Sequence, residues 1–244
     1  MERLQDLADR QWRDYRARVP GTCFADPDFA PPLADAYALQ DAVARIRTSA
    51  GDRIIGYKVG CTGPGTVRQF GMQGPIRGCL FESEIRKYDD SLDFDDFASP
   101  AIEGEMAVRI APDGTIAAAF PVIELHHFVF RGSRKTLPEL VANNGLNAGF
   151  VLPHDDWLSS QTYIAEKGTL SVRINGHTVA SGDLWPMPGG AEASLEWLRR
   201  HLALDLLPGH VILTGTPLGL YPVRRGDHVA VFVNHEIGSK CQVA

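Results

Sequence analysis

The chain lacks the features that mark secreted, metal-knuckle or membrane-spanning proteins. Its 244 residues include only four cysteines (Cys23, Cys61, Cys79 and Cys241), which have neither the CxxC spacing of zinc knuckles nor the density of a disulfide scaffold. No run of about 18 apolar residues could cross a bilayer, and the highly charged N-terminal sequence does not resemble a secretory signal. We therefore expect a cytoplasmic protein with no membrane partner.

Basic residues are also in deficit. Lysine and arginine total 24 against 30 acidic residues, which gives a formal net charge of −6. Nucleic-acid binding requires clustered positive charge, so we expect no nucleic-acid partner. Hydrophobic residues make up 44% of the chain, and a chain of this length buries enough surface to fold without a disulfide or a metal.

Predicted strands outnumber predicted helices and do not alternate regularly with them. Helical spacing and boundary signals predict helices at Leu4–Arg18, Asp35–Gly51, Leu137–Asn143 and Ala191–Leu204. Strands are predicted at Arg53–Gly60, Ile102–Ile110, Pro121–Phe130, Ser171–Ile174, Thr178–Ser181, His210–Thr214 and His228–Val233, with a hairpin turn at Asn175-Gly176. This order favours an α+β roll or barrel-like mixed sheet, with an N-terminal helical region (1–52) followed by one structural unit (53–244).

Acidic residues at alternate positions are the sharpest local feature. On a strand, Glu103 and Glu105 share one face about 7 Å apart, and Glu124 belongs to the next strand. Three converging carboxylates would form an all-oxygen site suited to Mg²⁺ or Mn²⁺. The pattern alone also fits solvated carboxylates on a half-exposed strand. His126 shares the face of Glu124 and could assist as an acid–base group, whereas His127 points away, so we expect His126→Ala to lower turnover more than His127→Ala.

A lysine and a small-residue turn are the other candidates. Lys58 lies within an apolar strand, flanked by Gly56 and Gly60. If it is buried, its pKa is lowered or it pairs with a carboxylate or bound anion; the pattern also fits a lysine that extends to solvent at the edge of a sheet. Thr214 and Thr216 follow a predicted strand and could receive an anionic oxygen. The segment at 63–66 lacks the spacing of a nucleotide-binding loop, and no GxSxG or HExxH motif is present.

The ordered set of motifs resembles the 2-keto-4-pentenoate hydratase group of the fumarylacetoacetate hydrolase superfamily, across nearly the whole chain. The matching segments are DAYALQ (35–40), GYKVG (56–60), GPIRGCL (74–80), IEGE (102–105), IE (123–124), LVANNGLNAGFVLP (140–153) and GHVILTGTPLGLYPVRRGDHVAV (209–231). The resemblance implies a mixed β-roll, a homo-oligomer and a small 2-oxo acid as substrate.

The resemblance also implies roles for individual residues. Glu103, Glu105 and Glu124 match the carboxylate metal ligands and Lys58 matches the active-site lysine. The Thr214–Thr216 turn matches a segment that holds the substrate carboxylate, and we also assign Arg77 to substrate binding. The implied reaction is addition of water to a 2-hydroxydienoate through a metal-stabilised enolate.

Departures from the group leave other reactions open. Ile76 and Arg77 follow Pro75 where the group often has an acidic residue, Leu146 replaces a serine, and His126 stands in a segment that commonly reads Asp-Ser-Arg. The segment TGTPLG (214–219) resembles the hydrolase and acylpyruvate branch of the superfamily more than the hydratases. The alternatives are decarboxylation of a 2-oxo-diacid, C–C hydrolysis of an acylpyruvate, or a non-catalytic role as partner of a related enzyme.

Overall fold

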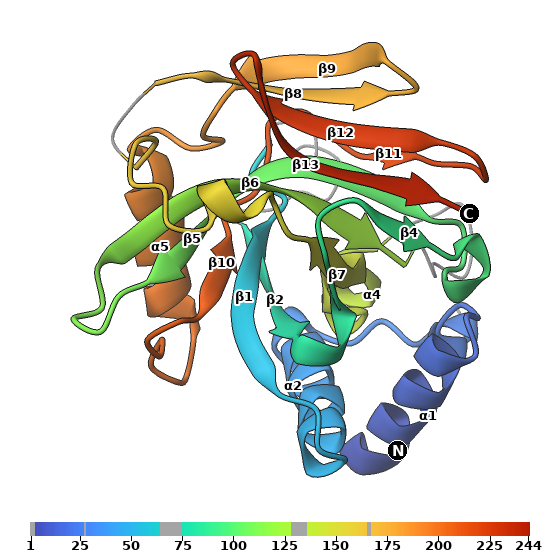
Figure 1. Ribbon diagram of the computed structural model, residues 1–244. Helices are drawn as coiled ribbons and strands as arrows, with labels where there is room; N and C mark the ends of the chain where they lie inside the picture. Colours follow the sequence, from blue (N-terminus) through green and yellow to red (C-terminus); the bar gives the residue numbers. More distant parts are fainter. Residues whose placement is uncertain (1–2, 27, 64–74, 128–135, 165–166) are drawn as a thin grey trace.

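The computed structural model describes residues 3–26, 28–63, 75–127, 136–164 and 167–244 (Figure 1). The helices are α1 (Leu4–Arg16), α2 (Leu33–Ser49), α4 (Leu137–Ala142) and α5 (Gly190–His201). The strands are β1 (Ile54–Gly60), β2 (Ile76–Phe81), β3 (Ile85–Arg86), β4 (Asp90–Leu92), β5 (Ala101–Ile110), β6 (Ile116–His126), β7 (Asn147–Val151), β8 (Thr169–Ile174), β9 (His177–Asp183), β10 (Val211–Leu213), β11 (Tyr221–Pro222), β12 (His228–Val233) and β13 (Glu236–Val243).

The strands of the described residues form two sheets. The larger has the order β2-β1-β10-β5-β6-β7-β3, with β11 paired to β5, and the smaller has the order β4-β13-β12-β8-β9. Figure 1 shows α1 and α2 at the opposite end of the molecule from β8 and β9. The predicted α+β class with a mixed sheet is confirmed. No helix in the described part of the chain has the length and apolarity that a membrane crossing requires.

Local sequence signals place several elements as expected. Asn175 and Gly176 both have positive φ angles, 52° and 79°, and join β8 to β9 as a two-residue hairpin turn. Gly51, with φ of 97°, follows the end of α2, where a left-handed residue commonly stops a helix. α5 buries Leu195 and Leu198 from one face, as its helical spacing predicted.

Strands whose sequences do not alternate cleanly were not predicted from the sequence. They are β2, β7 and β13, together with the short strands β3, β4 and β11. β2 is buried along its whole length although it contains an arginine and a glycine, so burial in this fold overrides the pattern. β6 begins at Ile116, five residues before its predicted start, and the predicted end of this strand at Phe130 lies outside the described residues.

The helical layer shares an apolar cluster with the sheet. Leu39 of α2 and Ala8 of α1 pack with Val141 of α4 and with Ile76 of β2. The cluster therefore joins the predicted N-terminal region to the rest of the chain. The buried Arg47 guanidinium of α2 forms ion pairs with Asp52 and Glu84 and lies over the Phe81 ring of β2.

The larger sheet curls so that strands far apart in its order approach one another. β2 and β7 lie in contact although four strands separate them in the sheet. The Asn144 side chain, just before β7, accepts a hydrogen bond from the Cys79 backbone N–H (2.7 Å) and donates one to the Cys79 carbonyl (2.8 Å). This curl gives the sheet a concave interior, toward which β1, β5 and β6 contribute polar side chains.

Gly104 allows the two sheets to pack closely behind this interior. A Cβ atom at Gly104 would lie 2.5 Å from Val172 Cγ2 of β8 and 3.0 Å from Val231 Cγ2 of β12. Because successive strand residues face opposite sides, Glu103 and Glu105 then point away from the second sheet. The Glu-Gly-Glu sequence thus combines two acidic groups on one face with a close sheet contact on the other.

Substitution of Gly104 should show this packing directly. We expect Gly104→Ala to lower the free energy of unfolding by about 1–3 kcal/mol, because the added methyl group overlaps the Val172 side chain. Urea unfolding measures the change. Val172→Ala in the Gly104→Ala background should recover part of the loss, as a coupling between the two sites. Additive losses would show that the two side chains do not compete for the same space.

Candidate active site

Four polar side chains of β5 and β6 face the interior of the curled sheet. In the antiparallel register, Glu103 is paired directly with Glu124, and His126 is paired with Ala101. Glu105 lies two residues along β5 from Glu103, on the same face. Glu105, Glu124 and His126 are buried, whereas the Glu103 side chain is 20% exposed. Three carboxyl groups and an imidazole are therefore brought together by strand alternation and register.

Glu124 is held by two donors from outside its own strand. Its Oε1 atom accepts hydrogen bonds from Lys58 Nζ of β1 at 2.6 Å and from Asn147 Nδ2 of β7 at 2.7 Å. Burial alone would raise the pKa of Glu124, but the Lys58 ammonium lowers it to about 2. Among the described residues, its other oxygen, Oε2, has no hydrogen-bond partner although it is buried. Glu124 is thus an ionised carboxylate with one oxygen fixed and one directed to the cluster.

Lys58 is a buried cation in this structure. Burial would lower its pKa, but Glu124, Glu103 and Glu105 raise the pKa above its ordinary value. Of the alternatives that the sequence left open, the ion pair with a carboxylate is the one observed. Lys58 is therefore a positive charge held beside the carboxylates.

Glycines surround the Lys58 side chain and make room for it. Cβ atoms at Gly60 and Gly78 would lie 3.0 Å and 3.1 Å from its methylene carbons. The Gly145 carbonyl accepts a further hydrogen bond from Nζ at 3.3 Å, and residues 144–146 all have left-handed φ angles. Such a run is strained for the non-glycine residues Asn144 and Leu146. The strained turn brings a neutral acceptor to the buried ammonium.

Glu105 is oriented by the turn that follows β10. Its Oε2 atom accepts a hydrogen bond from the Gly215 backbone N–H at 2.9 Å. Gly215 has a φ of 88°, and a Cβ atom there would lie 2.5 Å from the Thr62 hydroxyl. Burial, followed by the charges of Glu124 and Glu103, raises the pKa of Glu105 well above its ordinary value. A charge on Glu105 is therefore disfavoured unless a cation balances it.

The two threonines of this turn use their hydroxyl groups mainly within the protein. Thr214 Oγ1 donates to the Met106 carbonyl of β5 at 2.8 Å, which fixes the turn to the strand. Thr216 Oγ1 accepts from the Leu218 backbone N–H at 3.1 Å, so its own proton stays available to another acceptor. The turn therefore acts on the site chiefly through the Gly215 amide.

Arg77 is directed toward the helical layer rather than toward the carboxylates. Its guanidinium forms two hydrogen bonds of 2.9 Å with Asp41 of α2 and one of 3.0 Å with Gln40, and it lies over the Tyr37 ring. No ion pair joins it to the carboxylate cluster within the described ranges. Its observed contacts attach β2 to α2.

The donor atoms fit a divalent cation. One atom each from Glu103, Glu124 and His126 lie within 4.8 Å of one another. Glu124 Oε2 and both His126 ring nitrogens are buried without hydrogen-bond partners among the described residues, an expensive arrangement unless a cation or water satisfies them. A hard ion with oxygen ligands would neutralise the repulsion between the neighbouring carboxylates.

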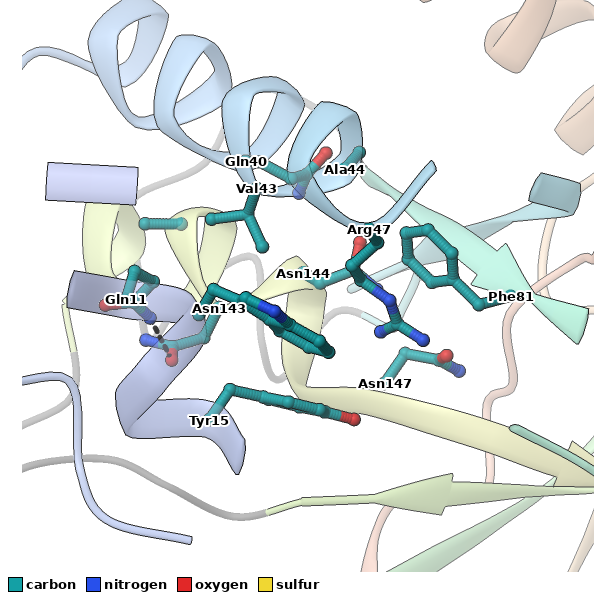
Figure 2. Close-up of a pocket in the computed structure, with 12 residues that line it drawn as sticks. Gln11, Tyr15, Gln40, Val43, Ala44, Arg47, Phe81, Asn143, Asn144 and Asn147 are labelled. Atoms are coloured by element: carbon teal, nitrogen blue, oxygen red, sulfur yellow. Dashed lines mark hydrogen bonds between the residues drawn. The ribbon is translucent and has the colours of Figure 1, made fainter. Parts of the chain in front are cut away.

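Asn147 is a contributor that the sequence analysis did not single out. It is completely buried, donates to Glu124, and accepts a hydrogen bond from the Gly149 N–H through its own Oδ1 at 3.0 Å. It also lines a cavity of about 30 Å³ beside the helical layer, together with Asn143 and Arg47 (Figure 2). In the sequence, Asn147 directly precedes the apolar segment 148–151. A polar amide in that position is a signal that could have identified it.

Solved structures define the class of fold. The chain superimposes on 4-oxalocrotonate decarboxylase from Pseudomonas putida G7, complexed with magnesium and adipate, with a TM-score of 0.86 at 20% identity, covering 99% of this chain and 97% of that one. A fumarylpyruvate hydrolase from Pseudomonas aeruginosa, in complex with Mn²⁺ and pyruvate, aligns with a TM-score of 0.60 at 14% identity, covering 77% and 88% of the two chains. The fold is that of the fumarylacetoacetate hydrolase superfamily.

Sequence comparison confirms the narrower resemblance to the 2-keto-4-pentenoate hydratase group. The chain is 28% identical over 210 residues to the TodF product hydratase of Pseudomonas putida F1, covering 80% of this chain and 78% of the relative. It is 27% identical over 199 residues to a 2-keto-4-pentenoate hydratase of Paraburkholderia phymatum, covering 74% of each chain. A 4-oxalocrotonate decarboxylase of Pseudomonas sp. CF600 is 26% identical over 214 residues, with 82% and 81% covered. No family model matches the chain.

Proposed function

We propose that the chain is a divalent-metal-dependent hydro-lyase that adds water to a small 2-hydroxydienoate. The observation that carries the proposal is the buried carboxylate cluster, in which Lys58 fixes one oxygen of Glu124 and leaves the other directed to Glu103. The hydratases among the sequence relatives support the reaction. Solved structures of the same fold contain magnesium, manganese or calcium, which supports the cofactor.

The residues of the cluster divide into ligands and supports. Glu103, Glu105 and Glu124 would hold Mg²⁺ or Mn²⁺, which when bound supplies a Lewis acid that stabilises negative charge on the C2 oxygen of a 2-oxo acid. Lys58 fixes Glu124 Oε1, and the Gly215 amide fixes Glu105 Oε2. Carboxylates held in this way need little reorganisation when charge develops on a substrate.

The substrate would meet the exposed side of the cluster, at Glu103. Thr216 belongs to the turn that holds Glu105, and its free hydroxyl proton would donate to a substrate carboxylate. Lys58 contributes positive potential beside the carboxylates. Because Arg77 is already paired with Asp41, we leave it out of the proposed substrate site.

Substrate consumption tests the proposal. We expect the purified protein with Mn²⁺ to consume 2-hydroxypenta-2,4-dienoate, and expect a metal chelator to abolish this activity. Parallel assays with 4-oxalocrotonate, oxaloacetate and an acylpyruvate separate the alternatives. Turnover of 4-oxalocrotonate alone would favour decarboxylation, the second candidate, which relatives of 24–26% identity named 4-oxalocrotonate decarboxylase support.

The non-catalytic alternative gives a different result in the same experiment. A partner protein that keeps only the fold would consume none of the four compounds. If the protein also failed to bind Mn²⁺, the proposed metal site would be contradicted.

Removal of the Asn147 amide should weaken metal binding. Asn147→Ala takes away the second donor to Glu124 Oε1, so we expect Mn²⁺ affinity to fall about 10–100-fold, measured by calorimetric titration. Asn143→Ala is the matched control, because Asn143 is also buried beside the cavity but bonds Gln11 and the Glu139 carbonyl instead (Figure 2). Equal metal affinities in the two variants would contradict a role for Asn147 in positioning Glu124.

A further inference from the structure

We propose that His126 is itself a ligand of the bound ion, so that this chain has a mixed nitrogen and oxygen site that favours a first-row transition ion over Mg²⁺. The inference rests on the proposed function for the presence of a metal, and it adds the identity of the donor set. It changes the interpretation of His126 from an acid–base group to a ligand.

The position of the His126 ring is the first observation. Its Nε2 atom lies 3.4 Å from Glu103 Oε2 and 3.6 Å from Glu124 Oε2, which are longer than good hydrogen bonds. Neighbouring ligands of an octahedral ion with bond lengths of about 2.1 Å lie about 3 Å apart. The three atoms are therefore too far apart for good hydrogen bonds, but they lie within 4.8 Å of one another, close enough for one ion to contact all three.

The isolation of the ring is the second observation. His126 is only 3% exposed, and neither of its ring nitrogens has a hydrogen-bond partner within the described part of the chain. A buried imidazole with two unsatisfied nitrogens costs free energy that a bond to a metal would offset. A buried histidine whose two ring nitrogens both form hydrogen bonds within the protein would not need a metal bond to offset this cost.

His127 provides that contrast one residue away. Its Nδ1 atom accepts a hydrogen bond from the Ala98 N–H at 3.0 Å, and its Nε2–H donates to the Tyr15 carbonyl at 3.1 Å. Both nitrogens are therefore satisfied by backbone groups. Only one of the two adjacent histidines has a free nitrogen aimed at the carboxylates.

The donor set determines which ion is preferred. Mg²⁺ strongly prefers oxygen ligands, whereas imidazole suits later first-row ions, whose affinity rises from Mn²⁺ through Co²⁺. Two carboxylates and one imidazole at the centre of the cluster should thus favour Co²⁺ and Mn²⁺ over Mg²⁺. The third carboxyl group, Glu105, remains beside them, held by Gly215.

Pulsed electron paramagnetic resonance of the Mn²⁺-loaded protein detects the nitrogen ligand directly. We expect modulation from a directly bound ¹⁴N in the wild type, replaced by a ¹⁵N pattern when histidine is ¹⁵N-labelled, which requires no substitution. The signal should persist in His127→Ala and disappear in His126→Gln. Calorimetry should show Co²⁺ affinity falling about 10–100-fold in His126→Gln, with a much smaller change for Mg²⁺.

The outcomes separate this inference from the proposed function. Bound Mn²⁺ without nitrogen modulation, in a protein that still consumes the dienoate, would overturn the ligand role of His126 and leave the proposed function intact. Equal losses of Co²⁺ and Mg²⁺ affinity in His126→Gln would overturn the selectivity. A wild-type protein that binds no divalent ion would overturn both proposals.

Discussion

Glu124→Gln is expected to lose metal binding, activity and stability together. The glutamine is nearly isosteric but neutral, so the buried Lys58 ammonium is left without its counter-charge. Breaking a buried ion pair from one side costs about 3–5 kcal/mol in the free energy of unfolding. We also expect Mn²⁺ affinity to fall more than about 100-fold and turnover to fall by about 10²–10³. Urea unfolding, calorimetric titration and the dienoate assay measure the three effects.

Two other glutamates provide controls for this prediction. Glu103→Gln should lose metal affinity and keep most of its stability, because Glu103 is partly exposed and pairs with no lysine or arginine among the described residues. Glu82→Gln removes only an exposed ion pair with Arg53 and should leave all three properties nearly unchanged. If Glu124→Gln behaved like Glu82→Gln, the cluster would not be the metal site.

Lys58→Met should separate stability from metal affinity. Loss of the ammonium leaves the Glu124 carboxylate buried and unpaired, so we expect the metal-free protein to lose about 3–5 kcal/mol. The cluster becomes more negative, so Mn²⁺ affinity should be retained or increase, and Mn²⁺ should raise the melting temperature more than it does in the wild type. Turnover should nevertheless fall by about 10²–10³, because Glu124 Oε1 keeps only its Asn147 donor and is less firmly fixed.

The double variant tests whether the two residues act as a pair. Lys58→Met combined with Glu124→Gln removes both charges, so we expect it to be more stable than the sum of the single losses predicts. If Lys58→Met lost metal affinity as Glu124→Gln does, Lys58 would have to act on the ligands in some way other than as a counter-charge.

The alternation of side chains along a strand was sufficient to predict which residues of β5 and which residues of β6 share a face. Period-two alternation put Glu103 with Glu105 and Glu124 with His126, and the observed register pairs Glu103 with Glu124. The same alternation correctly directed His127 away from them. These inferences depend only on strand geometry and so do not require knowledge of the whole fold.

Contacts that depend on the curl of the sheet could not be predicted in this way. Lys58 reaches Glu124 across the interior although β10 and β5 separate their strands, and Asn147 approaches from β7. The strands β2 and β7, whose contact accompanies this curl, were among those the sequence pattern did not reveal. The ion pair of Lys58 is therefore a tertiary property, and the sequence could give it only as one of several alternatives.

A crystal grown with Mn²⁺ and oxalate tests the central claim most directly, because the paired oxygens of oxalate imitate the enolised end of a 2-oxo acid. The account predicts an anomalous manganese peak within bonding distance of Glu103 and Glu124, with oxalate oxygens completing the coordination. Manganese bound elsewhere, or no anomalous peak beside these carboxylates at saturating Mn²⁺, would contradict it.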